Sequence, residues 1–454
     1  MGNIITKALP GFMELLPEEQ IEFDRIKTVI LSTYERFGFT PIDTPAIERG
    51  QTLLAKAGGE TAKQIYSVEN KRGGTGVTED KVSEPVLRFD LTVPLARYVA
   101  EHFNDLSFPF RRYHIAKAYR GERPQRGRFR EFYQCDIDVI GRDKLSIRYD
   151  AEIPSIIYQI FKQLDFGKFT IRVNNRKLMS GLIEALDISA DAVEVMRIID
   201  KAEKVSQEAF ASMLQENNLT EAQISGIKRF MAISGKTEDV LKALKELNIN
   251  NELFNLGLEE LATVTSMMEE MGVDSDYYQI DLSIARGLDY YTGTVYETKL
   301  DDHPQIGSVC SGGRFDNLAS HYINEKLPGV GMSIGLTRLF DQLRALKMVS
   351  ATRKTTADAI VVPMDENNIK TALGVAGELR KNGFNADVLL EDWSVKNKFK
   401  YVSKKDAAFT VVIGSDEERD NVIVLQYKNG DEIKKERLPL DKAIAFMTAH
   451  KKEN

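Results

Sequence analysis

The stretch RRYHIAKAYRGERPQRGRFREFYQCDIDVIG, residues 111–141, decides the fold of this chain. Two runs that suit β-strands flank a loop containing Gly121 and Gly127, which predicts a β-hairpin. Between residues 111 and 130 there are eight Arg or Lys and one acid, Glu122, a local charge of +7 in a chain of net charge −7. Guanidinium groups on a rigid hairpin are suited to phosphate or carboxylate. The hairpin therefore predicts an anion-binding site, with a solvated surface loop as the alternative.

The composition is that of a globular protein, and the length of 454 residues predicts about three domains. Lys and Arg total 61 against 68 Asp and Glu, so any contact with nucleic acid must come from local basic patches. The two cysteines, Cys135 and Cys310, exclude a disulfide framework and favour a cytoplasmic location. The five histidines lack metal-ligand spacing and no run of 18 apolar residues occurs. We therefore expect neither a metal site nor a membrane span.

The chain around the hairpin changes character along its length. Residues 17–37 predict a helix that ends at Gly38. Apolar runs from Val86 to Gly141 predict antiparallel strands joined by hairpins. Residues 189–273 lack proline and contain a capping box at Thr220 and Gln223, which predicts an all-helical insertion. Strand-like, glycine-rich sequence resumes over 280–335, so the insertion interrupts the first unit.

Beyond residue 355 the pattern alternates between strands and helices, which predicts a small α/β domain with a largely parallel sheet. The expected elements are strands at 359–362, 386–390 and 409–413 and helices at 369–381 and 396–405. The last of these, KNKFKYVSKK, carries five lysines with Phe399 and Tyr401 between them. A solvated helix face is the ordinary meaning of such a run, and a surface for single-stranded RNA is the alternative.

Glycine-rich segments late in the first unit could line a small-molecule pocket. RGLDYYTGTVYE occupies 286–297, and Gly312 to Arg314 predict a turn. The glycines of 329–335 are spaced G-x-G-x-x-x-G, without the spacing or the βαβ context of a dinucleotide fingerprint. A nucleotide-cofactor oxidoreductase is therefore disfavoured, and it leaves the arginine hairpin unexplained. A P-loop is also absent, so ATP would need another architecture.

Together these segments resemble the class II aminoacyl-tRNA synthetases, and among them the histidyl-tRNA synthetase family, over nearly the whole chain. The first helix and the segment to Glu48 resemble motif 1, with Pro45 as its proline at a dimer interface. Residues 120–132 resemble motif 2, and 329–339 resemble motif 3. RGLDYYTGTVYE and SGGRFDNL, at 286–297 and 311–318, resemble the two histidine-specific signatures.

The resemblance implies an α+β fold whose catalytic core is built on the antiparallel sheet of class II synthetases. The core would comprise residues 1–180 and 276–350, interrupted by a helical insertion at 181–275. A C-terminal α/β anticodon-binding domain would occupy 355–454. The resemblance also implies a homodimer without a membrane partner.

The implied activity joins L-histidine to AMP from ATP, whose phosphates carry Mg²⁺, and passes the histidyl group to the 3′ end of tRNA(His). The first step brings a carboxylate onto an anionic α-phosphate, so fixed cations are needed. By resemblance Arg120 and Arg286 are the catalytic residues. Both approach the α-phosphate.

The remaining implied positions are grouped by ligand. Histidine-binding positions are Asp90, Leu91, Thr92, Arg120, Gln134, Asp138, Arg286, Tyr290 and Tyr291. ATP-binding positions are Arg120, Glu122, Phe132 and Arg338, and Arg123, Gln125 and Arg126 would contact the tRNA acceptor end. Asp138 and Tyr291 would hold the two imidazole nitrogens, which rejects isosteres because buried partners would be left unpaired. Asp90 and Asp138 stand where many bacterial members have glutamate, and Phe315 where many have tyrosine.

One alternative lies within the same resemblance. A catalytically silent, histidine-binding paralogue acts as a regulatory subunit of ATP phosphoribosyltransferase. Such relatives typically lack the anticodon-binding domain and have altered signature residues. This chain has Arg120, Arg286 and the C-terminal α/β sequence, which favours the enzyme.

Overall fold

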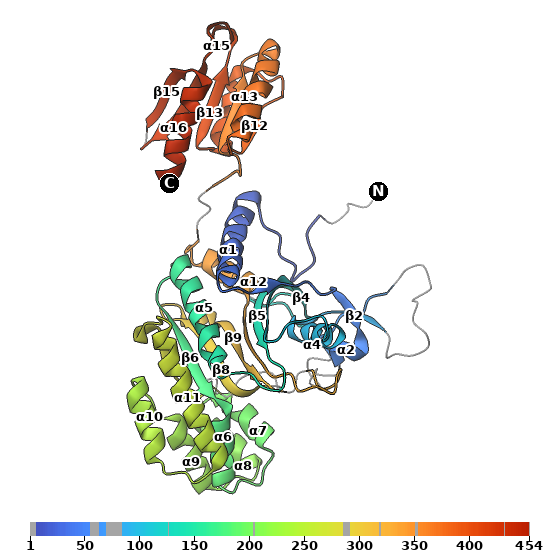
Figure 1. Ribbon diagram of the computed structural model, residues 1–454, viewed down its shortest axis with the longest axis vertical. Coiled ribbons are helices and arrows are strands. Elements are labelled where there is room, and N and C mark those ends of the chain that lie inside the picture. The colour runs from blue at the N-terminus through green and yellow to red at the C-terminus, as the bar shows by residue number, and fades with distance from the viewer. Residues whose placement is uncertain are drawn as a thin grey trace. The chain divides into compact units, whose positions relative to one another are not determined.

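The computed structural model describes residues 6–54, 63–69, 84–125, 127–202, 205–284, 291–316, 319–349, 353–430 and 432–453. The chain forms two compact units, Met1–Glu14 with Ile26–Met348 and Leu15–Arg25 with Val349–Asn454. Each is built on its own sheet, of eight strands in the first unit and five in the second (Figure 1).

The sheet of the first unit is mostly antiparallel, in the strand order β1-β4-β5-β10-β9-β8-β6-β7. Its strands are β1 (Thr40–Pro41), β4 (Phe110–Tyr119), β5 (Glu131–Ile140), β6 (Phe169–Asn175), β7 (Tyr278–Ile280), β8 (Tyr291–Leu300), β9 (Ser308–Phe315) and β10 (Gly329–Ile334). β4 and β5 pair in register from Phe110 opposite Ile140 to Tyr119 opposite Glu131. The predicted hairpin is confirmed, and short parallel pairings occur at β1 and β7.

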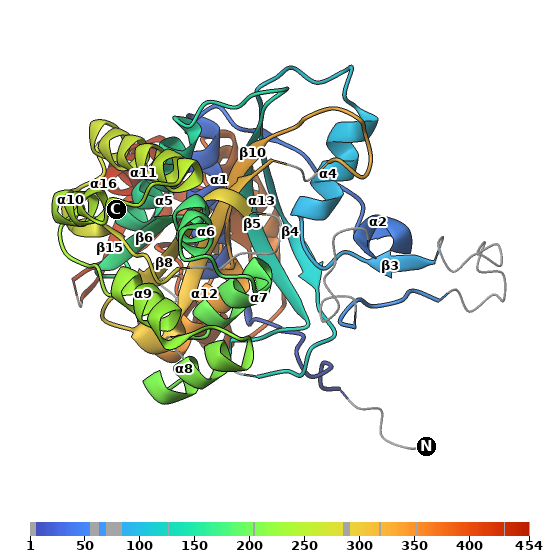
Figure 2. The same ribbon diagram turned by 90° about the horizontal axis from the view of Figure 1, so that it is seen from below.

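Two expectations for local structure were wrong. Residues 92–101 form a helix, α4 (Thr92–Glu101), because the carboxylate of Asp90 accepts a hydrogen bond from Val93 N and so caps the first turn. Its apolar face packs on Phe110 at the end of β4 (Figure 2). Gly312–Arg314 lie inside β9 and make no turn. A short two-stranded sheet, β2 (Ile47–Arg49) with β3 (Pro85–Leu87), and α2 (Gly50–Leu54) complete this side.

One face of the eight-stranded sheet is apolar and covered by two helices. On α1 (Pro17–Arg36), Ile26 and Ile30 are buried and the hydroxyl of Tyr34 donates to Cys135 O at 3.0 Å. On α5 (Tyr149–Leu164), Asp150 forms a buried ion pair with Arg314 of β9 at 2.7 Å. Because side chains alternate along a strand, the residues next to Cys135 on β5 and next to Arg314 on β9 point to the opposite face of the sheet, where the candidate site lies.

The helical insertion is confirmed as helical. Its elements are α6 (Arg176–Ala185), α7 (Ala192–Ile199), α8 (Gln207–Glu216), α9 (Glu221–Met231), α10 (Thr237–Glu246) and α11 (Glu252–Glu270), followed by the turn η3 (Ser275–Tyr277). They gather beside β6 and β8 in Figures 1 and 2. The predicted capping box between Thr220 and Gln223 begins α9. The first unit also contains η4 (Pro304–Ile306) and α12 (Leu336–Ala345).

The second unit has a three-layer α/β architecture. The sheet order is β12-β11-β13-β14-β15, from β11 (Ala359–Pro363), β12 (Ala386–Val388), β13 (Phe409–Ile413), β14 (Ile423–Asn429) and β15 (Glu432–Leu438). Its helices are η5 (Glu366–Asn368), α13 (Ile369–Lys381), α14 (Val395–Lys405), α15 (Ser415–Asp420) and α16 (Leu440–Glu453). α13 and α16 cover one face of the sheet and α14 the other. The first three strands are parallel as predicted, but the hairpin β14–β15 is antiparallel and was missed.

The lysines of α14 do not form one uniform surface. Lys398 is buried and its ammonium donates to the carbonyl oxygens of Pro363 and Met364 at 2.8 and 3.3 Å. Lys396, Lys400 and Lys404 are exposed at spacings of four, which places them on one helix face. Only part of the lysine run is therefore available to phosphate.

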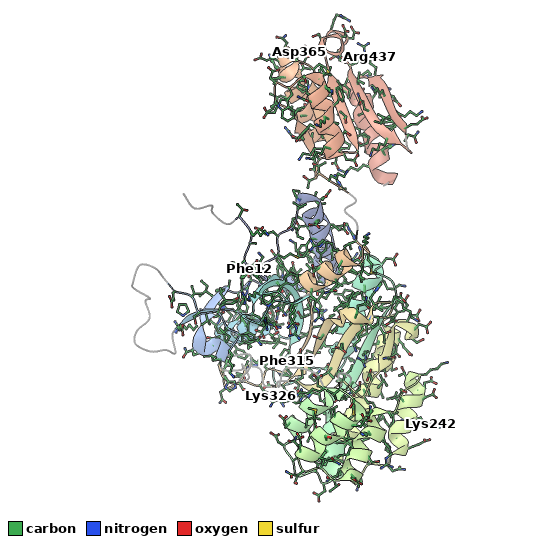
Figure 3. The ribbon with its side chains drawn as sticks, turned by 180° about the vertical axis from the view of Figure 1, so that it is seen from behind. Phe12, Lys242, Phe315, Lys326, Asp365 and Arg437 are labelled. Atoms are coloured by element: carbon green, nitrogen blue, oxygen red, sulfur yellow. The ribbon has the colours of Figure 1, made fainter. Side chains whose placement is uncertain are left out.

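Asp150→Ala should destabilise the first unit by about 3–5 kcal/mol, because the buried Arg314 guanidinium would lose its only carboxylate partner among the described residues. Thermal and urea unfolding followed by circular dichroism would measure the loss. Glu246→Ala is the matched control, since Glu246 pairs at 3.9 Å with the exposed Lys242 (Figure 3) and should cost within about 0.5 kcal/mol. Equal effects of the two changes would show that the Asp150–Arg314 pair adds nothing to stability.

Candidate active site

The candidate site lies on the polar face of the eight-stranded sheet. Arg112 of β4, Asp138 of β5, Gly331 of β10 and Gly313 of β9 stand side by side in register across four strands. Directly paired residues point to the same face of a sheet. The row therefore presents a charged pair next to two positions without side chains.

The two glycines leave room for their neighbours. A Cβ on Gly331 would overlap Oδ1 of Asp138. A Cβ on Gly313 would lie 2.6 Å from Thr294 O and 3.0 Å from Cδ1 of Tyr291. Asp138 and Tyr291 therefore lie over two glycines that are directly paired on β10 and β9, which places both side chains in the same part of the site face.

Asp90 supplies an unused acceptor at the N-terminus of α4. One carboxylate oxygen accepts from Val93 N at 3.2 Å, and the other, Oδ2, is buried without a hydrogen-bond partner. Burial raises the pKa of Asp90 to about 7, and the charge of Arg120 opposes that rise. Leu91 is the buried N-cap and Thr92 the first helical residue. A cation bound at Oδ2 would satisfy this oxygen and favour its ionised form.

Gln134 supplies a second unused acceptor on β5. Its Nε2 donates to Ser333 Oγ at 3.1 Å, while its buried Oε1 has no hydrogen-bond partner. Buried polar atoms in native proteins are nearly always paired, so an orphaned acceptor indicates a ligand. An ammonium group, which has three donors and no acceptor, suits Asp90 Oδ2 and Gln134 Oε1 together.

The pair formed by Arg112 and Asp138 is buried, with Nη2 and Oδ2 2.6 Å apart. Burial raises the pKa of Asp138 to about 8, against the lowering effect of Arg112. Beside this pair, His114 stands opposite Asp136. Burial, with the charge of Arg112 next, lowers the pKa of His114 to about 4, and burial raises the pKa of Asp136. The floor is therefore acidic, with Arg112 as its buried cation.

The arginine hairpin forms one wall. Arg120 donates from Nε to Phe89 O at 3.1 Å, and its guanidinium lies 5.0 Å from the ring centre of Phe132. These contacts hold the side chain while its terminal amino groups contact no carboxylate among the described residues. Glu122 pairs with Arg128 at 3.4 Å. The hairpin thus presents a cation above an aromatic ring, an arrangement suited to a phosphate and a base.

The hairpin tip is tightly turned. Gln125 and Arg128 form an isolated antiparallel bridge, and Arg123 and Gln125 are exposed. Gly127 has a φ of 72°, which favours glycine, and packs against Gln342 of α12. Arg126 lies outside the described residues.

Arg338 reaches the same region from α12. The hydroxyl of Thr337 accepts from Tyr133 N at 2.8 Å, and a Cβ on Gly127 would lie 3.7 Å from Cγ of Arg338, so the start of α12 lies against the hairpin. Arg338 is exposed and donates to Ile306 O at 2.7 Å. The sequence-based ATP group Arg120, Glu122, Phe132 and Arg338 is thus assembled on neighbouring elements.

Arg286 and Tyr290 lie outside the described residues, so their predicted roles stay predictions. Sequence reasoning missed Arg112, Asp136 and Ser333, which the structure places in the floor. A signal was present, because Arg112 and His114 alternate with apolar residues as Asp136 and Asp138 do on the facing strand. Their pairing could be recognised only from the register.

Among the described residues, no cluster of three His, Cys, Asp or Glu could hold a metal ion. Within the same part of the chain, no helix is long and apolar enough to cross a membrane. Both cysteines are buried free thiols.

Comparison with known proteins gives two family matches. A family described as histidyl-tRNA synthetase matches residues 11–339, and one described as an anticodon binding domain matches 358–450. The histidine–tRNA ligase of Clostridium tetani is 52% identical over 440 residues, covering 97% of each chain. The crystal structure of histidyl-tRNA synthetase from Nostoc sp. PCC 7120 matches with a TM-score of 0.89 and 39% identity over 99% of this chain and all of that one.

A more distant structure shares the fold alone. It is titled as an ATP phosphoribosyltransferase regulatory subunit/histidyl-tRNA synthetase from Bacillus halodurans, and matches with a TM-score of 0.73 and 20% identity over 91% of this chain and 99% of that one. The fold by itself therefore does not distinguish an enzyme from a regulatory relative. The site must do so.

Asp90→Asn should stabilise the ligand-free protein at pH 8 and progressively less toward pH 5. Because burial raises the pKa of Asp90 from 3.8 to about 7, the folded chain holds a proton below about pH 7 that the unfolded chain has released. The free energy of unfolding of the parent therefore falls as pH rises from 5 to 7, by up to about 3 kcal/mol for two pH units, and levels off above pH 7. The amide variant lacks this dependence.

Thermal unfolding of both proteins between pH 5 and 8 would check the prediction. Asp302→Asn, at an exposed acid, is the control and should track the parent. A parent-to-variant difference that does not change with pH would contradict it.

Proposed function

This chain belongs to the histidyl-tRNA synthetase family, and we propose that it joins L-histidine to tRNA(His) through a histidyl-adenylate formed from ATP. The observation that carries the proposal is the pair of buried, unpartnered acceptors, Asp90 Oδ2 and Gln134 Oε1, beside the glycine-lined space of Asp138. An amino acid with a polar ring fits these features. Its ammonium group would donate to the two acceptor oxygens, and its ring would lie beside Asp138.

The histidine subsite would use its members in different ways. Asp90, Thr92 and Gln134 hold the α-ammonium, and Asp138 and Tyr291 hold the imidazole nitrogens. Tyr290 and Leu91 line the pocket. Because a site built to hydrogen-bond a ring leaves buried groups unpaired when the ring nitrogens are missing, it discriminates by chemistry as well as by size.

Adenylate formation would depend on cations held in place before the reaction. Arg120 is anchored through Nε to Phe89 O, which leaves its terminal amino groups to bridge the histidine carboxylate and the α-phosphate. Arg286 would approach the α-phosphate from the other side. The adenine would lie between Phe132 and Arg338, with Glu122 at its edge and Mg²⁺ carried by the ATP phosphates. Preorganised charge of this kind stabilises the in-line transition state.

A homodimer forms part of the proposal. An open depression of about 1010 Å³ is lined by Pro45, Tyr98 and Tyr322, among other residues. Ile47 borders this depression, and Ile47 and Leu54 are exposed, 48% and 50%. A second copy of the chain packed on this surface would bury them.

The division of labour follows the predicted domains. Residues 1–180 and 276–350 would form the catalytic core, 181–275 the insertion and 355–454 the anticodon-binding domain. From Thr355 onward there are 16 Lys or Arg against 17 Asp or Glu, so attraction for RNA must be local. Because its partners are tRNA and ATP, we propose that the protein works in the cytoplasm.

The regulatory-subunit alternative is less well supported. The 52% identity to a histidine–tRNA ligase extends over both units, whereas the structure titled as a regulatory subunit is only 20% identical.

Histidine-dependent exchange of pyrophosphate into ATP tests the function directly. The parent should show exchange with L-histidine and none with other amino acids. Arg286→Ala should lower the rate by about 10²–10³, because one cation aimed at transition-state charge is lost, while the fold by circular dichroism stays intact. Histidine binding without any exchange in the parent would point to the regulatory alternative.

Gln125→Ala should impair transfer to tRNA more than pyrophosphate exchange. The exposed loop with Arg123, Gln125 and Arg126 can supply phosphate contacts and base-edge hydrogen bonds to an acceptor end. Single-turnover transfer from preformed adenylate, compared with exchange, separates the two steps. Equal losses in both assays would place the loop at ATP.

Lys400→Ala should weaken tRNA binding about twofold to tenfold at low salt and reduce its salt dependence, because Lys400 is on the exposed face of α14. Pyrophosphate exchange should not change. Lys398→Met, at the buried lysine of the same helix, should instead lower the stability of the second unit. Identical tRNA binding by the parent and Lys400→Ala would remove this face from the RNA contact.

A further inference from the structure

Arg112 is the most deeply buried arginine among the described residues. Its exposure is 0%, compared with 5% for Arg88, 6% for Arg314 and 7% for Arg172. It extends from the middle of β4, opposite Asp138, onto the site face of the sheet. The neighbours of Arg112 must therefore explain why a cation is buried at this position.

The contacts of Arg112 do not stabilise the fold enough to explain why a cation is buried there. Nη2 lies 2.6 Å from Asp138 Oδ2, yet none of the three guanidinium nitrogens forms a hydrogen bond of good geometry. Arg314, by contrast, donates to Asp150 and to the carbonyl oxygens of Leu145 and Ser146. A buried charge with unmet donors destabilises a fold relative to apolar packing. Arg112 therefore resembles a functional group more than a structural one.

We propose that Arg112 is a positioning residue for histidine recognition: by holding Oδ2 of Asp138, it presents the other oxygen, Oδ1, as the acceptor for an imidazole N–H. Oδ1 lies over Gly331, where the Cβ of any larger residue would overlap it, so the glycine is what allows the carboxylate to take this orientation. The inference rests on the proposed function, in which Asp138 contacts the imidazole.

The charges around Asp138 explain why a cation is needed there. Asp136, on the same strand, and Asp90, at α4, both repel the Asp138 carboxylate, and Arg112 attracts it. His114 is the other basic group on β4 at this face, and burial keeps it neutral by lowering its pKa to about 4. Without Arg112, three buried carboxylates would face one another and Asp138 would hold its proton to higher pH. A protonated Asp138 could rotate and no longer accept from the ring in one fixed geometry.

The KM values for histidine and ATP in pyrophosphate exchange test the inference. Arg112→Met should raise the histidine KM at least about tenfold at pH 7.5 and leave the ATP KM within about twofold, since the buried cation paired with Asp138 is lost from one subsite only. Because Asp138 of the parent ionises near pH 8 and that of the variant at higher pH, the fall of the histidine KM with rising pH should be displaced to higher pH in the variant. Arg111→Met is the matched control, because Arg111 points to the other face and pairs with Glu152 at 2.8 Å.

A double-mutant cycle separates positioning from a structural role. If Arg112 acts through Asp138, Arg112→Met should add less than about twofold in histidine KM to Asp138→Ala. Effects that multiply in full, or a histidine KM and an ATP KM that rise together, would overturn the inference. Should Arg112→Met fail to fold, Arg112→Lys decides: the charge is kept but the planar fork is lost, so the histidine KM should lie between the parent and Asp138→Ala. A parental value in that variant, or an ATP KM that rises with it, would also overturn the inference.

The proposed function can fail separately. If Asp138→Ala leaves the histidine KM unchanged, the imidazole site lies elsewhere and the proposed function is wrong at that residue. If Asp138→Ala raises the histidine KM and Arg112→Met does not, only the role of Arg112 is wrong.

Discussion

The backbone pairing between β4 and β5 is the constraint on which the site depends. Ten residues of each strand pair without a break, and this register puts Arg112 beside Asp138 and His114 beside Asp136. A slip of β5 by one residue would turn Asp136 and Asp138 to the face covered by α1 and α5, away from Arg112 and His114. The same pairing closes the hairpin that carries Arg120 and Phe132. Residues of the candidate site are thus aligned by hydrogen bonds of the main chain.

The candidate site contains buried polar groups that lower the stability of the ligand-free protein. Asp90 and Asp138 are buried carboxylates with raised pKa values, and Gln134 Oε1 and Asp90 Oδ2 have no hydrogen-bond partners. Each is unfavourable in the ligand-free protein, and a bound cation or ring donor would offset that cost. Strain of this kind is characteristic of functional sites. Elsewhere, buried charges such as Arg314 and Asp150 are fully hydrogen-bonded and stabilise the fold.

The second unit shows the same contrast between structural and available charge. Lys398 is used internally, where its ammonium binds two carbonyl oxygens at the end of β11. Lys396, Lys400 and Lys404 stay exposed on the same helix. A count of lysines therefore overstates the surface that RNA can use. The surface that RNA can contact is better described by the number of exposed lysines on one face of the helix.

The sequence alone determined the hairpin, the helical insertion, the parallel start of the second sheet and the family, because these depend on local pattern and on uncommon strings of residues. It missed α4, β14 and β15, since capping by Asp90 and antiparallel additions to a parallel sheet depend on contacts outside the local pattern. The pairing of Arg112 with Asp138 and the burial of Lys398 were decided only by tertiary structure. Both depend on which residues stand opposite one another, and register and burial are properties of the assembled sheet.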